Sequence, residues 1–296
     1  MKVFKSYEKG IKEATAQPKM ISVLWIINFI FGAIIFYLFY GRLSEVIGRS
    51  LIAEKLLKKF DYNFLFEFLV SNAQSNKAIF SVAVLLIIIY FLISIFLYGG
   101  ILFRLVHSQR SYDTGRNKDR FAPVFFQGAG RFFGRFFRLF IYSLILWFVF
   151  LVIIFILIRV GGALTAKGTK EQLAFYIILV ELGIGLFLLC LIKMILDYTR
   201  IKIVTEDSQY VFRSLFKTIK FVFQNFGKTL GLYYLIMVTG LILFGIHWVL
   251  RMIIPNYSLI TILITFIVYQ FFIASRGWLK IAFQAAQMSF YSSESI

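Results

Sequence analysis

A stretch with the sequence QGAGRFFGRFFRLF, at Gln127–Phe140, has the residue types and spacing that most suggest a chemical function. Glycines ahead of a helix can cradle a phosphate, and in dinucleotide-binding proteins such a loop follows a β-strand. No strand pattern precedes these glycines, and strand patterns do not alternate with helical ones along the chain. The stretch therefore does not predict a nucleotide site.

Placed on a helix at about 100° per residue, the same stretch separates into two faces. Its three arginines share one stripe and its phenylalanines fill the opposite arc; a second stretch, Arg213–Phe226, repeats the basic stripe. Each pattern predicts an amphipathic helix at a membrane interface, with cationic groups toward lipid phosphate and apolar side chains toward the acyl chains. A groove on a partner protein is the alternative for the phenylalanine rings. The predicted anionic-lipid interface consists of Arg131, Arg135, Arg138, Arg213, Lys217 and Lys220.

Charged residues inside apolar runs are the other candidates, since an ionised group in hydrocarbon is costly unless it is paired. Glu181 and His247 lie in different runs at depths that allow a proton or substrate path, or a structural clamp between helices. We expect Asp197 to pair with Arg200 or with Arg276. The intramembrane charged candidates are Glu181, His247, Lys193, Asp197, Arg200 and Arg276.

Signatures of catalysis are missing from the sequence. It contains two histidines and one cysteine, Cys190, and neither a His-Glu-x-x-His nor a Gly-x-Ser-x-Gly motif. One cysteine forms no disulfide within the chain, and these residues have no metal-ligand spacing. We therefore expect a non-enzymatic protein with no catalytic residues, no metal and no cofactor.

Long apolar runs are the elements that must position these residues. Of 296 residues, 60% are hydrophobic and only 16% are charged, which is typical of a membrane protein. We predict an all-α polytopic membrane protein in which residues 1–296 form one integral membrane domain. Its six transmembrane helices make three hairpins, joined by cytoplasmic amphipathic interfacial helices. The predicted spans are about 20–40, 78–103, 137–158, 173–196, 229–254 and 258–283.

The distribution of basic residues predicts the orientation. Twenty lysines and arginines fall on the side that carries both termini, and ten fall on the other side. By the positive-inside rule, both termini of this multi-pass protein lie in the cytoplasm, and we expect it in the cell (inner) membrane. The net charge of +18 then indicates contact with anionic headgroups rather than with nucleic acid. The first connection, 41–77, is predicted to be a helical loop on the outer surface.

The segment at Asp197–Leu235, DYTRIKIVTEDSQYVFRSLFKTIKFVFQNFGKTLGLYYL, resembles part of a loose group of bacterial six-span membrane proteins. It is similar to the membrane domain found on some glycerophosphodiester phosphodiesterases. The shared features are Asp197 and Arg200 at the membrane exit, the turn at Glu206 and Asp207, an amphipathic helix and the next span. The resemblance implies a six-helix fold and implies no activity.

The spacing of lysines and arginines beside the spans also matches between hairpins. It favours three repeated hairpins, without deciding whether they arose by duplication.

Taken together, these patterns favour a scaffold, assembly factor or accessory subunit that contacts membrane lipids and partner membrane proteins. The spans contain few polar residues, and little of the chain lies outside them. The alternative is a transporter or permease for a small or lipidic solute that uses Glu181 and His247. Transporters usually combine discontinuous spans with several midplane polar groups.

Overall fold

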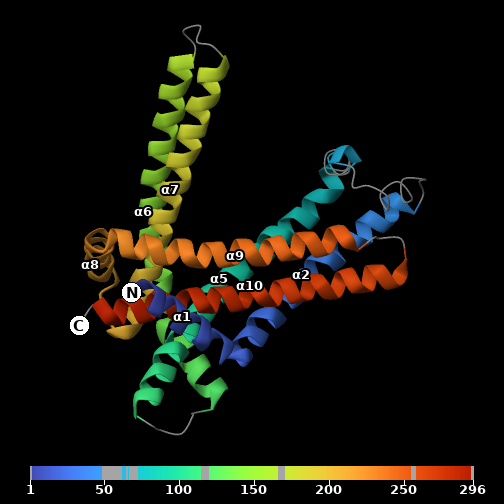
Figure 1. Ribbon diagram of the computed structural model, residues 1–296. Helices are drawn as coiled ribbons and strands as arrows, with labels where there is room; N and C mark the ends of the chain where they lie inside the picture. The colour runs from blue at the N-terminus through green and yellow to red at the C-terminus, as the bar shows by residue number, and fades with distance from the viewer. Residues whose placement is uncertain are drawn as a thin grey trace. The chain divides into compact units, whose positions relative to one another are not determined.

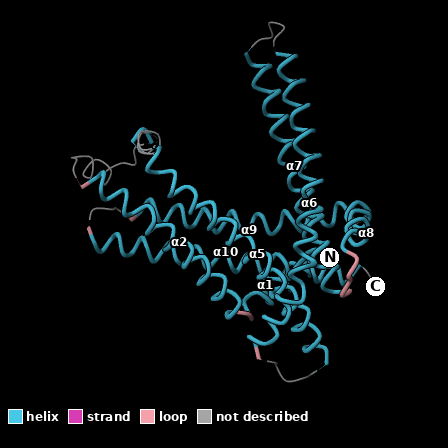
Figure 2. The backbone as a smooth tube through the Cα atoms, turned by 180° about the vertical axis from the view of Figure 1, so that it is seen from behind, coloured by secondary structure: helices cyan, strands magenta, loops and turns pink. Residues whose placement is uncertain are grey.

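The computed structural model describes residues 2–48, 62–64, 66, 73–114, 120–165, 171–254 and 258–294. Over these residues the chain is almost entirely helical and contains no β-strand (Figure 2). The helices are α1 (Lys2–Thr15), α2 (Pro18–Ile47), α5 (Ala73–Thr114), α6 (Phe121–Thr165), α7 (Glu171–Thr205), α8 (Val211–Gln224), α9 (Phe226–Ile253) and α10 (Leu259–Glu294).

Six of these helices, α2, α5, α6, α7, α9 and α10, are long and apolar enough to cross a membrane. They cover the six predicted spans, so the prediction of an all-α polytopic membrane protein is confirmed. Five of them extend well past the predicted spans, with α2 reaching Ile47, α5 reaching Thr114, α6 beginning at Phe121, α7 ending at Thr205 and α10 ending at Glu294. The predicted outer loop at 41–77 lies mostly outside the described residues.

Consecutive spans pack against each other as hairpins. The rings of Phe31 in α2 and Tyr90 in α5 are 5.2 Å apart, and the rings of His247 in α9 and Phe272 in α10 are 4.2 Å apart. Helices α6 and α7 run side by side (Figure 1). The helices are long because the sequence has only three prolines, one of which, Pro18, begins α2 where its missing N–H is not needed.

The chain divides into two compact units. Unit 1 comprises Met1–Ile11, Ile95–Leu235 and Phe283–Ile296. Its hydrophobic core gathers where α5 ends, α6 begins and α7 and α10 end, and each fully buried large side chain there stabilises the fold by roughly 1.5–3 kcal/mol. The largest of these buried side chains are Ile101, Leu105, Phe125, Phe132, Tyr198 and Phe290.

Unit 2 comprises Lys12–Ser94 and Ile236–Ala282. Polar side chains join its helices at several points. The Trp25 indole donates a hydrogen bond to the Gln270 carbonyl oxygen (3.1 Å), and the Tyr90 hydroxyl donates to the Asn28 carbonyl oxygen (2.8 Å). Both bonds satisfy polar groups that would be costly to leave unpaired inside a membrane.

Candidate functional site

The glycines of the QGAG stretch allow α5 and α6 to pack closely within unit 1. A methyl group on Gly128 would collide with the side chain of Phe103, and one on Gly100 would lie 2.8 Å from the Phe125 carbonyl oxygen. Only a hydrogen atom fits at either position. On the same helix Phe132 and Phe136 are 1% and 3% exposed. The prediction that these two rings reach the acyl chains is wrong, because the protein core covers them.

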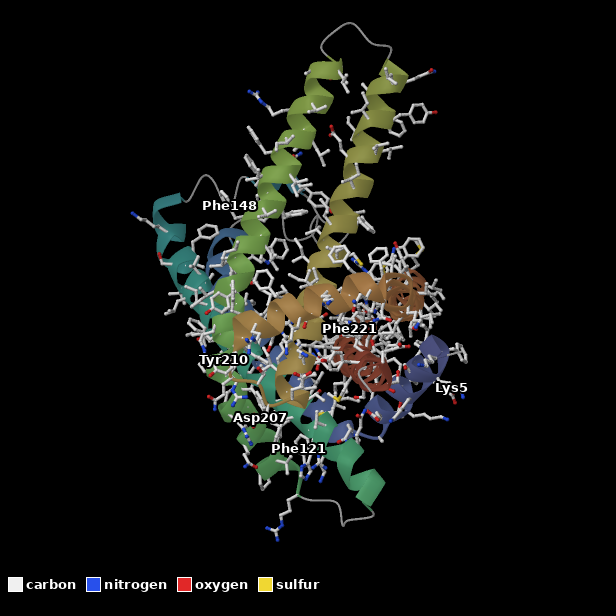
Figure 3. The ribbon with its side chains drawn as sticks, turned by 90° about the vertical axis from the view of Figure 1, so that its left-hand side faces the viewer. Lys5, Phe121, Phe148, Asp207, Tyr210 and Phe221 are labelled. Atoms are coloured by element: carbon white, nitrogen blue, oxygen red, sulfur yellow. The ribbon has the colours of Figure 1, made fainter. Side chains whose placement is uncertain are left out.

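The turn after α7 brings Asp207 against α6. The Ser208 N–H donates to the Ile203 carbonyl (3.1 Å), and Asp207 has a φ of 50°, so α7 ends in the left-handed turn that glycine usually forms. Asp207, labelled in Figure 3, accepts hydrogen bonds through its carboxylate. The donors are Arg131 and Nη1 of Arg135, the latter at 2.7 Å. Two of the predicted lipid-binding arginines therefore bind a carboxylate of the protein itself.

Arg135 is the better fixed of the two arginines. Its guanidinium lies 5.0 Å from the centre of the buried Phe132 ring, and its side chain is 12% exposed. The hydrogen bond from Arg135 is the main reason that the pKa of Asp207 lies below its usual value, and the charge of Arg131 adds to the effect. This pairing holds the α7–α8 turn against α6.

A second network joins the end of α7 to the end of α10. The Lys202 ammonium donates to Glu206 (2.5 Å) and to the Tyr291 hydroxyl (2.9 Å), and that hydroxyl donates to the same Glu206 oxygen (2.8 Å). Burial favours the neutral form of Glu206, but the bonds from Lys202 and Tyr291 outweigh burial and lower its pKa. Sequence reasoning missed this network. The i,i+4 spacing of Lys202 and Glu206 could have shown half of it, whereas Tyr291 carries no local signal.

Buried polar side chains continue from this network into the core of unit 1. Tyr198 precedes Lys202 by one helical turn and Gln287 precedes Tyr291 by one turn, so the Lys202–Tyr291 contact places them at a similar level. The Tyr198 hydroxyl and both polar atoms of the Gln287 amide have no hydrogen-bond partner within the described ranges. Such groups can donate and accept hydrogen bonds but supply no nucleophile or base at neutral pH.

The remaining charged candidates of α7 and α10 occupy separate positions. Arg200 donates to Asp197 at 2.9 Å, which is one of the two expected pairs, and its guanidinium lies 4.7 Å from the Tyr98 ring centre. Lys193 is exposed, with its ammonium 6.0 Å from the Phe283 ring centre. Arg276 is an exposed residue of unit 2.

Glu181 and His247 each contact the other helix of their own hairpin. The half-buried Glu181 carboxyl fills the space beside Gly161 of α6, where a methyl group would overlap it. The His247 ring is buried and stacks on Phe272 of α10, and its Nδ1 has no hydrogen-bond partner in the described part of the chain. Because Glu181 belongs to unit 1 and His247 to unit 2, a path between them stays a prediction.

Helix α8 presents the last three predicted residues, Arg213, Lys217 and Lys220, all exposed. Arg138 is also exposed and donates to the Gly134 carbonyl of its own helix, at 3.4 Å. Among the described residues no three His, Cys, Asp or Glu side chains gather as a metal site.

The chain matches no protein-family model, no curated protein and no solved structure. Its own geometry identifies it only as a multi-pass membrane protein with six apolar helices.

Proposed function

We propose that this protein is a non-enzymatic membrane scaffold, an assembly factor or accessory subunit that holds partner membrane proteins against its spanning helices. We further propose that it lies in the cell (inner) membrane with both termini in the cytoplasm. The excess of lysine and arginine on one side of the spans supports this orientation.

The α6–α7 hairpin carries the proposal. From Leu144 on α6 to Phe187 on α7, both helices expose large apolar side chains although they pack on each other (Figures 1 and 3). Trp147, Phe148, Phe155, Phe175, Tyr176 and Phe187 are aromatic, and aromatic residues are enriched at protein interfaces. A hairpin with apolar faces that carry exposed aromatic rings is suited to packing against another membrane protein. The most exposed of these side chains include Phe148, Leu151, Phe155, Phe175, Tyr176 and Val180.

Continuous helices also support a scaffold over a permease. Each of the six apolar helices runs without a break over its described length, whereas the binding sites of many transporters are built from broken helices. The buried polar groups of unit 1 gather near the end of α7 instead of half-way along it. These features stabilise a fold without requiring a solute path.

Affinity capture from membranes in a mild detergent tests the proposal. We expect a defined set of membrane proteins to co-purify with the wild type and to be lost from F148A/F155A/F175A. Phe4→Ala, which removes an exposed ring from α1 outside the spans, should retain that set. Capture of lipid alone would contradict the scaffold function.

A permease is the second candidate, and Glu181 is the observation that favours it. An acidic side chain inside a span is costly and marks a functional position by default. Glu181→Gln should abolish solute flux in proteoliposomes if the carboxyl lies on a transport path. A reduced folding yield with unchanged flux would show instead that Glu181 acts as a clamp beside Gly161.

A further inference from the structure

The two flanking spans confine α8 to a membrane surface. Span α7 ends at Thr205, shortly before α8 begins at Val211, and span α9 begins at Phe226, directly after α8 ends. Helix α8 packs on α7 and also touches α6. A short amphipathic helix between two such spans is of the kind that lies at the level of the headgroups.

Helix α8 carries three stripes rather than the two expected from the sequence. At about 100° per residue, its buried side chains cover roughly 100° around Val211. Three phenylalanines follow in an arc of about 40°, and the basic residues fill the next arc of about 60°. The phenylalanine stripe is Phe212, Phe216 and Phe223, exposed by 53%, 56% and 57%; the basic stripe is Arg213, Lys217 and Lys220.

The exposed rings of α8 continue onto a span. Phe212 contacts Tyr142 of α6 at 5.6 Å between ring centres and Phe216 of its own helix at 4.8 Å. Tyr142 follows Arg135 and Arg138 on one stripe of α6, in the direction of the exposed hairpin. The phenylalanine stripe therefore faces the apolar part of α6, which is the side on which acyl chains would lie.

The basic stripe of α8 is free to meet an anion from outside the protein. Within the described residues, Arg213, Lys217 and Lys220 have no hydrogen-bond acceptor; Lys217 only exerts a through-space attraction on Glu206. Arg131 and Arg135 differ because Asp207 binds both of them. The charge available for lipid is thus on α8, with Arg138 as its neighbour on α6.

We propose that α8 is a binding surface for anionic phospholipid, in which the basic stripe binds the headgroup phosphates while Phe212, Phe216 and Phe223 insert among the acyl chains. Charge and apolar area both select this occupant, since a free phosphate uses only the first stripe and a neutral lipid only the second. The inference rests on the proposed membrane orientation but does not need a partner protein.

Native mass spectrometry of the purified full chain tests this surface. The chain in dodecylmaltoside is titrated with dioleoylphosphatidylglycerol and, separately, with dioleoylphosphatidylcholine. We expect the wild type to bind phosphatidylglycerol clearly more tightly than phosphatidylcholine. R213Q/K217Q/K220Q should bind phosphatidylglycerol about tenfold more weakly than the wild type, or more weakly still. The matched variant K5Q/K9Q/K19Q removes the same charge from exposed lysines elsewhere and should bind within about twofold of the wild type.

Two further variants separate lipid binding from folding and from free phosphate. The charge-preserving variant R213K/K217R/K220R should bind like the wild type, and F212A/F216A/F223A should lose lipid while keeping its helical circular dichroism. Equal binding by the wild type and R213Q/K217Q/K220Q would overturn the proposal. So would full competition by inorganic phosphate, which would show a site for free anions. None of these results depends on partner capture, so a failed scaffold and a failed lipid surface are distinguishable.

Discussion

Substitution of Asp207 separates two contributions to the stability of the α7–α8 turn. One is the pairing of its carboxylate with two arginines, and the other is the strain of its left-handed backbone. The carboxylate and Arg131 are 47% and 46% exposed, so after solvent screening their pair contributes about 0.5 kcal/mol. Arg135 is 12% exposed, and its bond to the half-exposed carboxylate contributes about 1 kcal/mol, below the usual value for a buried charged bond. Loss of both partners should therefore destabilise the protein by about 1.5 kcal/mol.

The left-handed backbone of Asp207 adds a strain energy, which destabilises the turn and depends on the residue at this position. Glycine adopts a φ of 50° without strain, whereas alanine is strained there by about 1 kcal/mol more than glycine, and aspartate or asparagine by less. We therefore expect a loss of about 2 kcal/mol for Asp207→Ala, about 1 kcal/mol for Asp207→Asn and about 1 kcal/mol for Asp207→Gly.

Equilibrium unfolding in mixed dodecylmaltoside and dodecyl sulfate micelles, followed by far-UV circular dichroism, measures these differences. The exposed neighbour Gln209 supplies the control, since Gln209→Ala should change the unfolding free energy by less than about 0.5 kcal/mol. Equal losses for Asp207→Gly and Asp207→Ala would refute the left-handed strain argument. An Asp207→Asn variant as stable as the wild type would refute the ion-pair argument.

Four other predictions follow from contacts within the helical units. Gly10→Val should detach α1 and speed its amide hydrogen exchange, because even a methyl group there lies 2.6 Å from the α10 backbone. Tyr291→Phe should cost about 1–2 kcal/mol in unfolding free energy by removing a hydroxyl with two partners. Gly161→Val should destabilise the α6–α7 hairpin by about 1–3 kcal/mol in the same assay, whereas Gly162→Val, with open space around it, should not. The stability advantage of the wild type over Asp207→Asn should be constant near neutral pH. It should disappear as the pH falls below the usual carboxyl pKa of 3.8 and through the lowered folded value, because protonation then ends the pairing.

Hydropathy predicted the six spanning helices because long apolar runs have no other stable arrangement in a bilayer. The helical projection likewise grouped Arg131 with Arg135, and both reach the same carboxylate. Projection alone could not tell whether Phe132 faced lipid or protein, because the answer depends on α5, which packs through Gly100 and Gly128. Periodicity gives the faces of a helix but not its neighbours.

The polar network at the end of α7 shows the same limit. Lys202 and Tyr291 are 89 residues apart and meet only because α7 and α10 end together. The extra stripe of α8 was hidden because the sequence pattern contains one apolar face and one basic face, and the fold then buries only part of the apolar one. The sequence alone does not show that Phe212, Phe216 and Phe223 stay exposed, because their exposure depends on how α8 packs on α7.

Site-specific photocrosslinking in the membranes of living cells tests the scaffold function most directly. Benzoylphenylalanine is placed at Phe148, Phe155 or Phe175 on the exposed hairpin faces, and at Phe132 in the core as the control. The scaffold function predicts discrete adducts with another membrane protein at one or more hairpin positions and none at Phe132. Adducts with lipid alone at all three hairpin positions would contradict it.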